Sequence, residues 1–537
     1  MCVNNGRLSS LWTKLRNQKT KMRRLKVFVL CLMAFCILLL RHHYQVLYNR
    51  LGVRDLQAAS AKFKALRYFW TLTTSTNLSE PRGYQHNQNG RWTGHGNEDQ
   101  RGDEPAAPTD QDTVTFTLPD PTGPSGELHK RSFLLRDDAT QFFVRTKSGA
   151  TCFREGTDMA FLKVGERVQQ TGVGWHKILH FPQEEMKRDQ GQSSLGKSLA
   201  NCTCRPGWHG PHCGIPTMIQ HSNLPSKWRL MPRKVPRRVI NAININHEFD
   251  LLHARFHELA DAVDVFLVCE SNFTAYGSPK PLHFLHFLLN GTYNYMRHKI
   301  LYIFLDHFPK GGQQNGWIAD DYLRTFLSYD GMSRVKGVRP DDVFLINDAD
   351  EIPAREGILF LKLYDGWTEP VSIHMRKSLY GFFWKQPGTL DILSACTVAM
   401  LFSVYNRDGI SLRRREYFTM PGFRAYEKKN GQILLKWSIG SPIHYAGWHC
   451  SWCFSPEGIY YKLISAQNGD FPRWGDYAEK RDLNYIKNLI RTGGWFDGSV
   501  GQYPHTEHKE HMYAPKYMLN NPQRYKYMLE NPYAKKH

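Results

Sequence analysis

The sequence predicts an α/β fold with a mostly parallel sheet, because short apolar strands alternate with helical patterns along one part of the chain. Four runs rich in Val, Ile, Leu and Phe lie between residues 238 and 346, and polar residues follow three of them. Strands that alternate with helices favour a parallel sheet, whose ligands bind at the carboxyl ends of the strands. We therefore expect the functional side chains to meet in one crevice at that edge.

The expected elements follow in order from residue 238. Residues 238–243 form a first strand, residues 248–259 an amphipathic helix and residues 263–270 a second strand. Residues 300–305 and 343–346 form the third and fourth strands, each a short apolar run that is typical of a buried strand. The polar segments 241–246, 270–272 and 348–351 stand at strand ends and should face the crevice.

Two carboxylates, Asp348 and Asp350, come directly after the fourth strand. Carboxylates at alternate positions can converge on one hard cation such as Mg²⁺ or Mn²⁺. The alternative is a solvated acidic turn, which is the structure that two isolated acids at this spacing more often form. The buried strand, the further acid Glu351 and the helix-stopping Pro353 favour a metal site here.

The N-terminal region predicts an uncleaved membrane anchor. Residues 27–40 form an uninterrupted apolar run, which as a helix covers about 21 Å of a hydrocarbon core roughly 30 Å thick, so flanking residues must complete the span. Lys and Arg cluster before the run, which keeps the N-terminus cytoplasmic and the bulk of the chain lumenal. A cleaved signal peptide is the alternative, but no small-residue cleavage site follows the run.

Composition allows a large globular enzyme and argues against a nucleic-acid-binding protein. The 537 residues are 41% hydrophobic and carry a formal net charge of +21. In a lumenal protein without a nucleic-acid-binding module, this charge suits anionic nucleotide-sugars or membrane surfaces. Oligomeric state cannot be read from the sequence.

A cysteine motif follows the polar stem that we expect over residues 71–127. Residues 202–214 resemble the C-terminal half of an epidermal-growth-factor-like module, and with Cys152 they allow two disulfide bridges at most. Zinc bound by the three cysteines of this motif and His209 is the alternative.

A second cluster of aromatic residues and cysteines spans residues 437–453. Its Cys450 and Cys453 form a structural disulfide or remain two core thiols, since no thioredoxin-like context surrounds them. Trp448 and Trp452 either stack on sugar rings or belong to the core. A short repeat, residues 517–522 and 527–532, closes the chain without a functional interpretation.

Four motifs in order, beginning at Asn246, Glu270, Asp320 and Asp348, resemble glycosyltransferase family 17 over roughly residues 130–535. The resemblance implies a GT-A-like, Rossmann-type α/β domain in a Golgi membrane protein of type II topology. It implies inverting, Mn²⁺-dependent transfer of N-acetylglucosamine from UDP-N-acetylglucosamine in β1,4 linkage to the core β-mannose of N-glycans on glycoproteins.

The resemblance assigns roles to residues at the matching positions. Asp348 and Asp350 would bind the metal, and the contacts to the nucleotide-sugar would come from Asn241, Asn246, Glu248, Glu270 and Arg324. Inversion needs a carboxylate to accept the proton of the acceptor hydroxyl, and four candidates remain open: Glu351, Asp321, Asp320 and Asp476.

The expected organisation has six parts. They are a tail at 1–24, an anchor at 25–47, a stem at 48–130, a region with the cysteine motif at 131–222, the catalytic domain at 223–505 and a C-terminal extension at 506–537. A metal-dependent hydrolase that acts on glycans or phosphates is one alternative function. A non-catalytic adhesion protein built around the cysteine motif is the other.

Overall fold

The computed structural model describes residues 85–86, 92–93, 124–146, 149–160, 202–309, 315–465, 473–499, 503 and 506–534. By its internal contacts the chain divides into two units, Met1–Thr113 and Val114–His537. In the first unit β1 (Gln85–His86) pairs antiparallel with β2 (Trp92–Thr93). The predicted anchor lies outside the described residues, and none of the described helices has the length and apolar character needed to cross a membrane.

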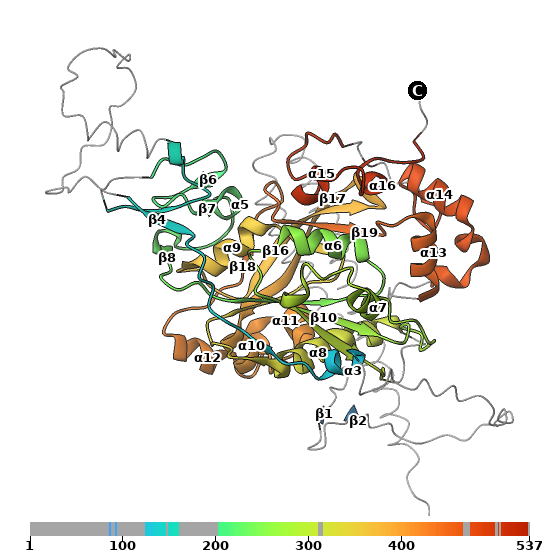
Figure 1. Cartoon of the computed structure of the whole chain (residues 1–537), viewed down its shortest axis with the longest axis horizontal. Coiled ribbons are helices and arrows are strands. Elements are labelled where there is room, and N and C mark those ends of the chain that lie inside the picture. The colour runs from blue at the N-terminus through green and yellow to red at the C-terminus, as the bar shows by residue number, and fades with distance from the viewer. Residues whose placement is uncertain are drawn as a thin grey trace, which may run out of the picture. The chain divides into compact units, whose positions relative to one another are not determined.

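The second unit is built around a nine-stranded sheet in the order β11-β10-β9-β13-β17-β16-β19-β14, with β18 also paired to β16 (Figure 1). The strands are β9 (Val239–Asn244), β10 (Val265–Ser271), β11 (Ile300–Leu305), β13 (Val343–Ile346), β14 (Glu351–Pro353), β16 (Val371–Leu379), β17 (Gly381–Thr397), β18 (Trp437–Ile439) and β19 (Gly447–Ser451). The four predicted strands are confirmed as β9, β10, β11 and β13.

Most strands of the sheet run in the same direction, and β17 and β14 are the two that oppose them. β11, β10, β9 and β13 are parallel to one another, as predicted. β17 then runs antiparallel to both β13 and β16, and β14 runs antiparallel to β19. The sheet is therefore mixed α/β, and the direction changes beside β13, the strand that leads into the acidic segment.

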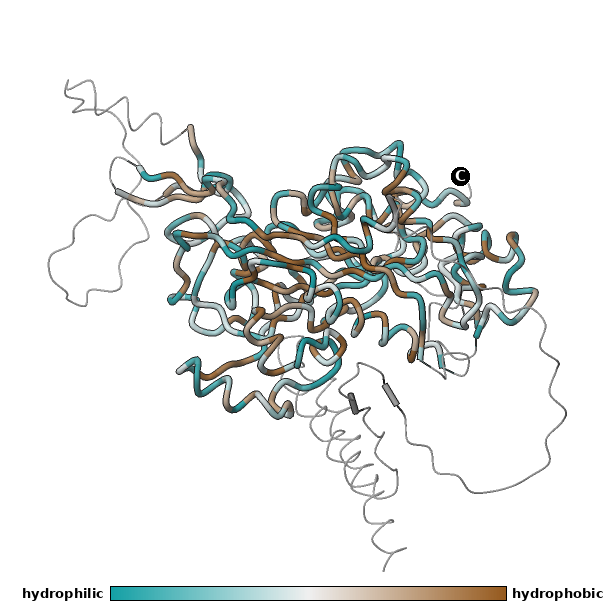
Figure 2. The backbone as a smooth tube through the Cα atoms, turned by 60° about the horizontal axis from the view of Figure 1, so that its bottom comes forward, coloured by the Kyte–Doolittle hydropathy of each residue, from teal (hydrophilic) through white to brown (hydrophobic). Residues whose placement is uncertain are grey.

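Helices cover both faces of the sheet. One face packs against α6 (Phe249–Glu258), α7 (His283–Leu289) and α9 (Arg355–Leu363), and the other packs against α8 (Gly316–Arg334), α10 (Val398–Ser403), α11 (Gly409–Arg414) and α12 (Phe423–Asn430). Along β9, Val239 and Ile243 face the first layer while Ile240 and Ala242 face the second. Because both faces are covered, strands such as β13 are hydrophobic without alternation, and brown segments run through the middle of the described chain in Figure 2.

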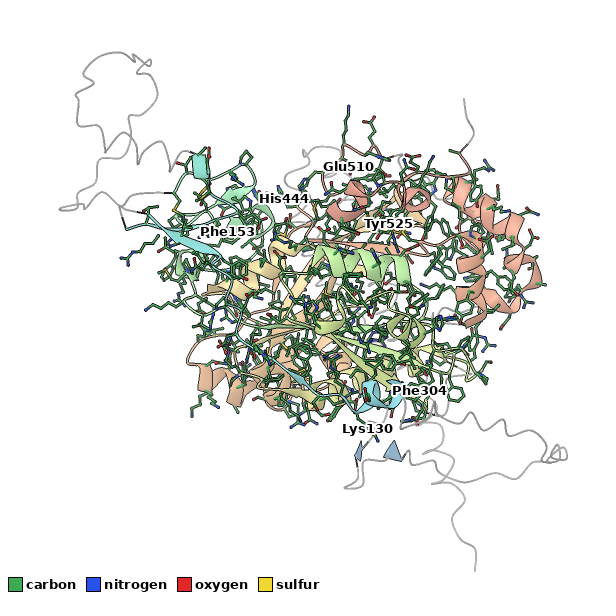
Figure 3. The ribbon with its side chains drawn as sticks, viewed as in Figure 1. Lys130, Phe153, Phe304, His444, Glu510 and Tyr525 are labelled. Carbon is green, nitrogen blue, oxygen red and sulfur yellow. A yellow bond between two sulfur atoms is a disulfide. The ribbon has the colours of Figure 1, made fainter. Side chains whose placement is uncertain are left out.

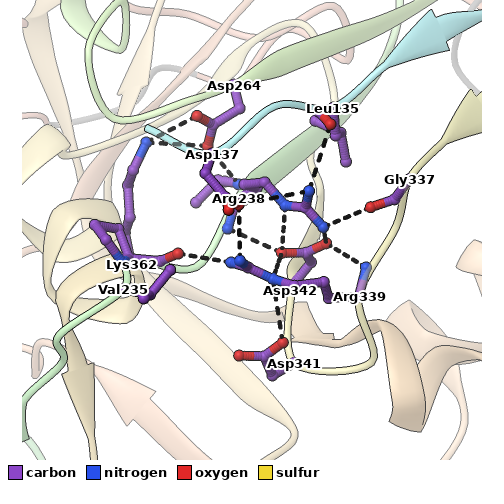
Figure 4. Close-up of polar contacts among 12 residues, drawn as sticks. Leu135, Asp137, Val235, Arg238, Asp264, Gly337, Arg339, Asp341, Asp342 and Lys362 are labelled. Carbon is purple, nitrogen blue, oxygen red and sulfur yellow. Dashed lines mark hydrogen bonds and ion pairs between the residues drawn. The ribbon is translucent and has the colours of Figure 1, made fainter. Parts of the chain in front are cut away.

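A buried ion pair holds β9 and β13 together at the end opposite the strands' carboxyl ends. Arg238 donates from Nε and NH2 to the two oxygens of Asp342, at 3.0 and 2.6 Å, and its NH2 also reaches the carbonyl of Gly337 (Figure 4). Arg339 donates its backbone N–H to Asp342, and Arg233 binds Asp341. The two acids that precede β13 thus have a structural role.

Smaller elements frame the sheet. Four two-stranded pairs are β3 (Phe133–Leu134) with β12 (Val335–Lys336), β4 (Phe143–Arg145) with β5 (Thr151–Phe153), β6 (Trp208–His209) with β7 (Ile215–Pro216), and β8 (Met231–Pro232) with β15 (Tyr364–Asp365). The remaining α-helices are α3 (Pro124–Lys130), α5 (Thr217–Gln220), α13 (Pro456–Ser465), α14 (Leu483–Thr492), α15 (Lys516–Asn520) and α16 (Lys526–Leu529).

Disulfides organise the cysteine motif. Cys152 pairs with Cys202, and Cys204 pairs with Cys213, which confirms the two predicted bridges. The zinc alternative is wrong, because all the thiols that it requires are oxidised. Its fourth ligand, His209, instead has Nε2 3.0 Å from the hydroxyl of Thr217.

The C-terminal repeat packs against the strands at one end of the sheet. Met518 of α15 and Met528 of α16 are buried in one cluster with Ile352 and Trp448, which belong to β14 and β19. Tyr525 lies close to α6, where its hydroxyl is 2.9 Å from Nδ1 of His253 (Figure 3). Each copy of the repeat therefore supplies one methionine to the core beneath the strands at the end of the sheet.

Candidate functional site

Asp348, the first acid after β13, is held by two arginines from different helices. Arg324 of α8 donates from Nε to Oδ1 at 2.9 Å and from NH2 to Oδ2 at 2.7 Å, and Arg413 of α11 reaches Oδ2 at 3.3 Å. Burial opposes ionisation of Asp348, but the two guanidinium groups outweigh it and hold its pKa far below the usual range. Asp348 is therefore a fixed anion.

Glu351 is clamped more completely. Arg413 donates from NH1 to Oε2 at 2.9 Å and from NH2 to Oε1 at 2.8 Å, and the backbone N–H of Asp348 donates to Oε2 at 3.1 Å. Arg255 of α6 donates to the backbone carbonyls of both Asp348 and Glu351. These contacts close the turn between β13 and β14 and fix the direction of the acidic loop.

Asp320 and Asp321 lie on α8, one helical turn before Arg324. Arg324 NH1 donates to Asp320 Oδ2 at 2.9 Å, so the same guanidinium joins α8 to the acidic loop. Burial raises the pKa of Asp320 to about 6, because the favourable charge of Arg324 only partly offsets it. Asp321 is paired with Arg414 at 2.8 Å.

Asp350 faces two cationic side chains at a longer distance. Nε2 of His449 and Nζ of Lys462 each lie 3.8 Å from its Oδ2. His449 belongs to β19, which pairs with β14 so that it lies opposite Glu351. Burial raises the pKa of Asp350, against the lowering effect of these two neighbours. A bound cation would offset the free-energy cost of burying the charged carboxylate of Asp350.

Asp350 and His449 could hold a metal ion together, because a carboxylate oxygen and an imidazole nitrogen are both metal ligands and here lie 3.8 Å apart. Asp348, by contrast, is engaged by Arg324 and Arg413. Over the parts of the chain that the structure describes, no group of three His, Cys, Asp or Glu side chains could hold a metal. Two protein ligands suffice where substrate phosphates supply the others.

Of the residues expected to contact the nucleotide-sugar, Asn246 is the one that lines a pocket at the ends of β9 and β10. Asn246, Ser271, Lys280 and Asp320 line a small pocket there, together with apolar side chains and Ser465 of α13. Asn241 lies inside β9 and donates to the carbonyl of Leu345. The strand ends of β9 and β10 thus lie beside the helix that carries Arg324.

Two expected contact residues hold backbone N–H groups, Glu270 at the start of α7 and Glu248 just before α6. Both oxygens of Glu270 accept backbone N–H groups at the start of α7, from Phe284 at 2.8 Å and Leu285 at 3.0 Å. Glu248 accepts the N–H groups of Asn246 and His247, each at 3.1 Å. Burial raises the pKa of Glu270, whereas for Glu248 nearby positive charges and these bonds overcome burial and lower the pKa.

The remaining candidate base, Asp476, has the most exposed side chain of the four. It is 53% exposed, against 4% for Glu351. Arg473 donates to both of its oxygens, at 2.9 and 3.2 Å, and also stacks on the ring of Tyr276 in the loop after β10. Asp476 is therefore tied through Arg473 to the loop after β10, and it can be approached from solvent.

Sequence reasoning missed five basic residues of this site: Arg255, Lys280, Arg413, His449 and Lys462. Arg255 carried the clearest signal, because in the sequence it stands among the apolar positions of α6, and the structure shows it fully buried. For the cluster at residues 437–453, the structure assigns the two tryptophans and the two cysteines a structural role. Trp448 and Trp452 are buried, and Cys450 forms a disulfide with Cys453.

Comparisons with known proteins agree with this geometry. A profile described as glycosyltransferase family 17 matches residues 209–390. The chain is 54% identical to beta-1,4-mannosyl-glycoprotein 4-beta-N-acetylglucosaminyltransferase of Rattus norvegicus over 528 residues, which is 96% of this chain and 94% of the relative. The proteins of the same name from Mus musculus and Homo sapiens are also 54% identical, with the same shares covered. The chain is a glycosyltransferase and belongs to glycosyltransferase family 17.

Proposed function

We propose that this protein transfers N-acetylglucosamine from UDP-N-acetylglucosamine in β1,4 linkage to the core β-mannose of N-glycans on glycoproteins. The name of its relatives supports the reaction and the acceptor sugar. The observation that carries the proposal is the acidic loop after β13, in which Arg324 and Arg413 fix Asp348 and leave Asp350 facing His449.

The fold proposal is a GT-A-like nucleotide-sugar transferase domain. Its support is the parallel order β11-β10-β9-β13 followed by an antiparallel β17, with the acids placed where the direction changes. The donor would lie along the carboxyl ends of β9 and β10, with its diphosphate toward Asp348 and Asp350. Arg324 and Lys462 are the cations nearest to those acids that could meet a phosphate.

A divalent metal, proposed as Mn²⁺, would be held by Asp350 and His449, with Asp348 behind them orienting the two arginines. When bound, such an ion neutralises charge on the leaving diphosphate. The remaining tasks, which are to position the acidic loop and to cover the donor site, belong to residues of this chain. The clamp on Glu351 fixes the loop, and burial by α13 excludes water from the donor.

The transfer is an inverting displacement. The 4-hydroxyl oxygen of mannose forms a bond to the anomeric carbon while the bond to the phosphate oxygen breaks, and UDP leaves with that electron pair. A carboxylate accepts the hydroxyl proton. Among the four candidates we propose Asp476 for this role. Both carboxylates accept hydrogen bonds from an arginine, but Glu351 is buried with Arg413, whereas the side chain of Asp476 is exposed to an incoming acceptor.

The cellular setting remains part of the proposal. The apolar run at 27–40, with basic residues before it, supports a type II Golgi membrane protein whose catalytic part is lumenal. Replacing residues 1–50 by a cleavable signal should then give a secreted, active enzyme. An inactive but soluble and folded product would show that the removed part is needed for transfer.

One assay tests the reaction itself. The lumenal part is incubated with UDP-N-acetylglucosamine, Mn²⁺ and a biantennary N-glycan, and the linkage of the added sugar is determined. A β1,4-linked residue on the core mannose is the expected product. Release of free N-acetylglucosamine without transfer would favour the hydrolase, and no consumption of the donor would favour a non-catalytic protein.

A further inference from the structure

A lysine that the expected site residues did not include stands unpaired in the pocket at the ends of β9 and β10. Nζ of Lys280 is shielded from solvent and has no hydrogen-bond partner. The loop after β10 brings it there, because the backbone N–H of Lys280 donates to the carbonyl of Asn272 at 2.8 Å and the turn between them is closed at Thr274 and Gly277. An unpaired shielded ammonium costs free energy, which a ligand acceptor would recover.

The charge of Lys280 is already balanced by protein groups. The carboxylates of Glu270 and Glu248 both act on it electrostatically, yet each already accepts backbone N–H groups rather than the ammonium. A diphosphate would therefore bring two more negative charges into a pocket that has no excess positive charge. A neutral group with a carbonyl oxygen suits Lys280 better.

Asn246 supplies the complementary group on the same pocket. Its Oδ1 is shielded and unpartnered, while its Nδ2 donates to Ser465 at 3.0 Å. The walls between Asn246 and Lys280 include the apolar side chains of Ile245 and Phe273. The pocket thus offers a donor and an acceptor across apolar walls, which matches the carbonyl and imide N–H of a uracil ring.

Resting on the proposed uridine donor, we infer that Lys280 reads the base of the nucleotide-sugar by donating a hydrogen bond to the C4 carbonyl of uracil, and that Asn246 accepts the neighbouring N3–H. The pocket adjoins the site already described, because it is also lined by Asp320, which shares Arg324 with Asp348. A ring held by Lys280 thus has its diphosphate directed toward the acidic loop.

The pocket is closed in this structure. Its free volume is about 20 Å³, room for about one water molecule. The contact between Asn246 and Ser465 joins the end of β9 to the end of α13. A uracil ring is larger than this space, so its binding requires the contact between Asn246 and Ser465 to open.

Binding of UDP and CDP separates this role from the alternatives. Cytosine presents an amino group and a bare ring nitrogen where uracil presents a carbonyl and an N–H, so the wild-type enzyme should prefer UDP. Lys280→Met should lose about 10- to 100-fold in affinity for UDP, the value of one hydrogen bond from a charged donor, while affinity for CDP changes little. Calorimetric titration of the lumenal enzyme measures both.

Two further variants serve as controls for Lys280→Met. Lys299→Met removes another partly buried lysine, whose Nζ donates to the carbonyls of Ala260 and Val263 away from the pocket, and it should leave the preference for UDP unchanged. Lys280→Gln keeps an N–H donor and should keep more of the preference than Lys280→Met, which also serves if the methionine variant does not fold.

The outcomes are distinct. An equal loss for UDP and CDP would assign Lys280 to the diphosphate, and unchanged binding of both would leave it with a water molecule only; either result overturns the inference. A wild-type enzyme that binds neither nucleotide would instead contradict the proposed donor.

Discussion

Arg413 and Glu351 form a two-point contact in which two guanidinium nitrogens meet two carboxylate oxygens at 2.9 and 2.8 Å. Both side chains are 4% exposed, so the pair is buried. Such a geometry is strong and directional. It makes Glu351 a structural anchor of the acidic loop, although this residue stood first among the sequence-based candidates for the base.

Glu351→Ala should therefore act mainly on stability. Removing one partner of a buried ion pair typically costs about 3–5 kcal/mol, because the other charge is left uncompensated. Chemical denaturation should show this loss. The double variant Glu351→Ala with Arg413→Met should recover part of it, since no charge is then stranded. A folded, fully stable Glu351→Ala protein without activity would return Glu351 to the list of bases.

Substitutions of the two acids of the loop, Asp348 and Asp350, should differ in their effects on stability. Asp350→Asn should abolish metal-dependent transfer and keep or raise stability, because burial disfavours the charge at this position. Asp348→Asn should lower both activity and stability, because Arg324 and Arg413 lose their shared anion. Thermal unfolding and transfer assays at several Mn²⁺ concentrations measure the difference. Identical stability changes in the two variants would contradict this division of roles.

Asp476→Asn tests the proposed base. General-base catalysis contributes about 10²- to 10⁴-fold, so kcat should fall by that range while the affinity for UDP stays near wild type. Stability should change little, because an exposed ion pair such as that with Arg473 contributes about 0–1 kcal/mol. Asp321→Asn is the matched control. If that variant loses kcat and Asp476→Asn does not, the base lies on α8.

The disulfides should differ in their contribution to stability. Cys152 and Cys202 are 50 residues apart, Cys204 and Cys213 are 9 apart, and Cys450 and Cys453 only 3 apart. Chain entropy then predicts losses of about 4, 2.5 and 1.5 kcal/mol on removal. Pairwise Ser variants compared by thermal unfolding check the order. Mass spectrometry of the unreduced protein should find all three bridges.

Acid should destabilise the fold through His247. Burial lowers its pKa from the ordinary 6.5 to about 4, and its Nε2–H donates to the carbonyl of Gly458 at 2.9 Å. Between these pH values the unfolded chain binds the proton and the folded protein does not, so the free energy of unfolding decreases as pH falls from about 6.5 to about 4. His247→Phe should flatten that slope. His298→Phe, at an exposed position, should leave it unchanged.

Local sequence patterns were sufficient to predict the first four strands of the sheet, but they did not predict the ion pairs of the site. The strand predicted at 343–346 coincides with β13, because an apolar run buried on both faces has an unambiguous signature. The partners of Glu351 carry no such signature. Arg413 is 62 residues away and Arg255 is 96 residues away, and their meeting depends on how α11 and α6 pack on the sheet.

Local sequence pattern also did not predict the two reversed strands, β17 and β14. β17 pairs with both β13 and β16. The direction of a strand depends on which connection follows it, and periodicity does not encode that. His449 shows the consequence, since it reaches Asp350 only because β19 runs antiparallel to β14.

The C-terminal repeat makes the catalytic apparatus dependent on the end of the chain. Met518 and Met528 pack against Ile352 of β14 and Trp448 of β19, the two strands that bring Asp350 and His449 together. During synthesis domains fold from the N-terminus as the chain emerges. Here Met518 and Met528 cover those strands from far along the sequence, so the strands reach their final packing only after the repeat has been synthesised.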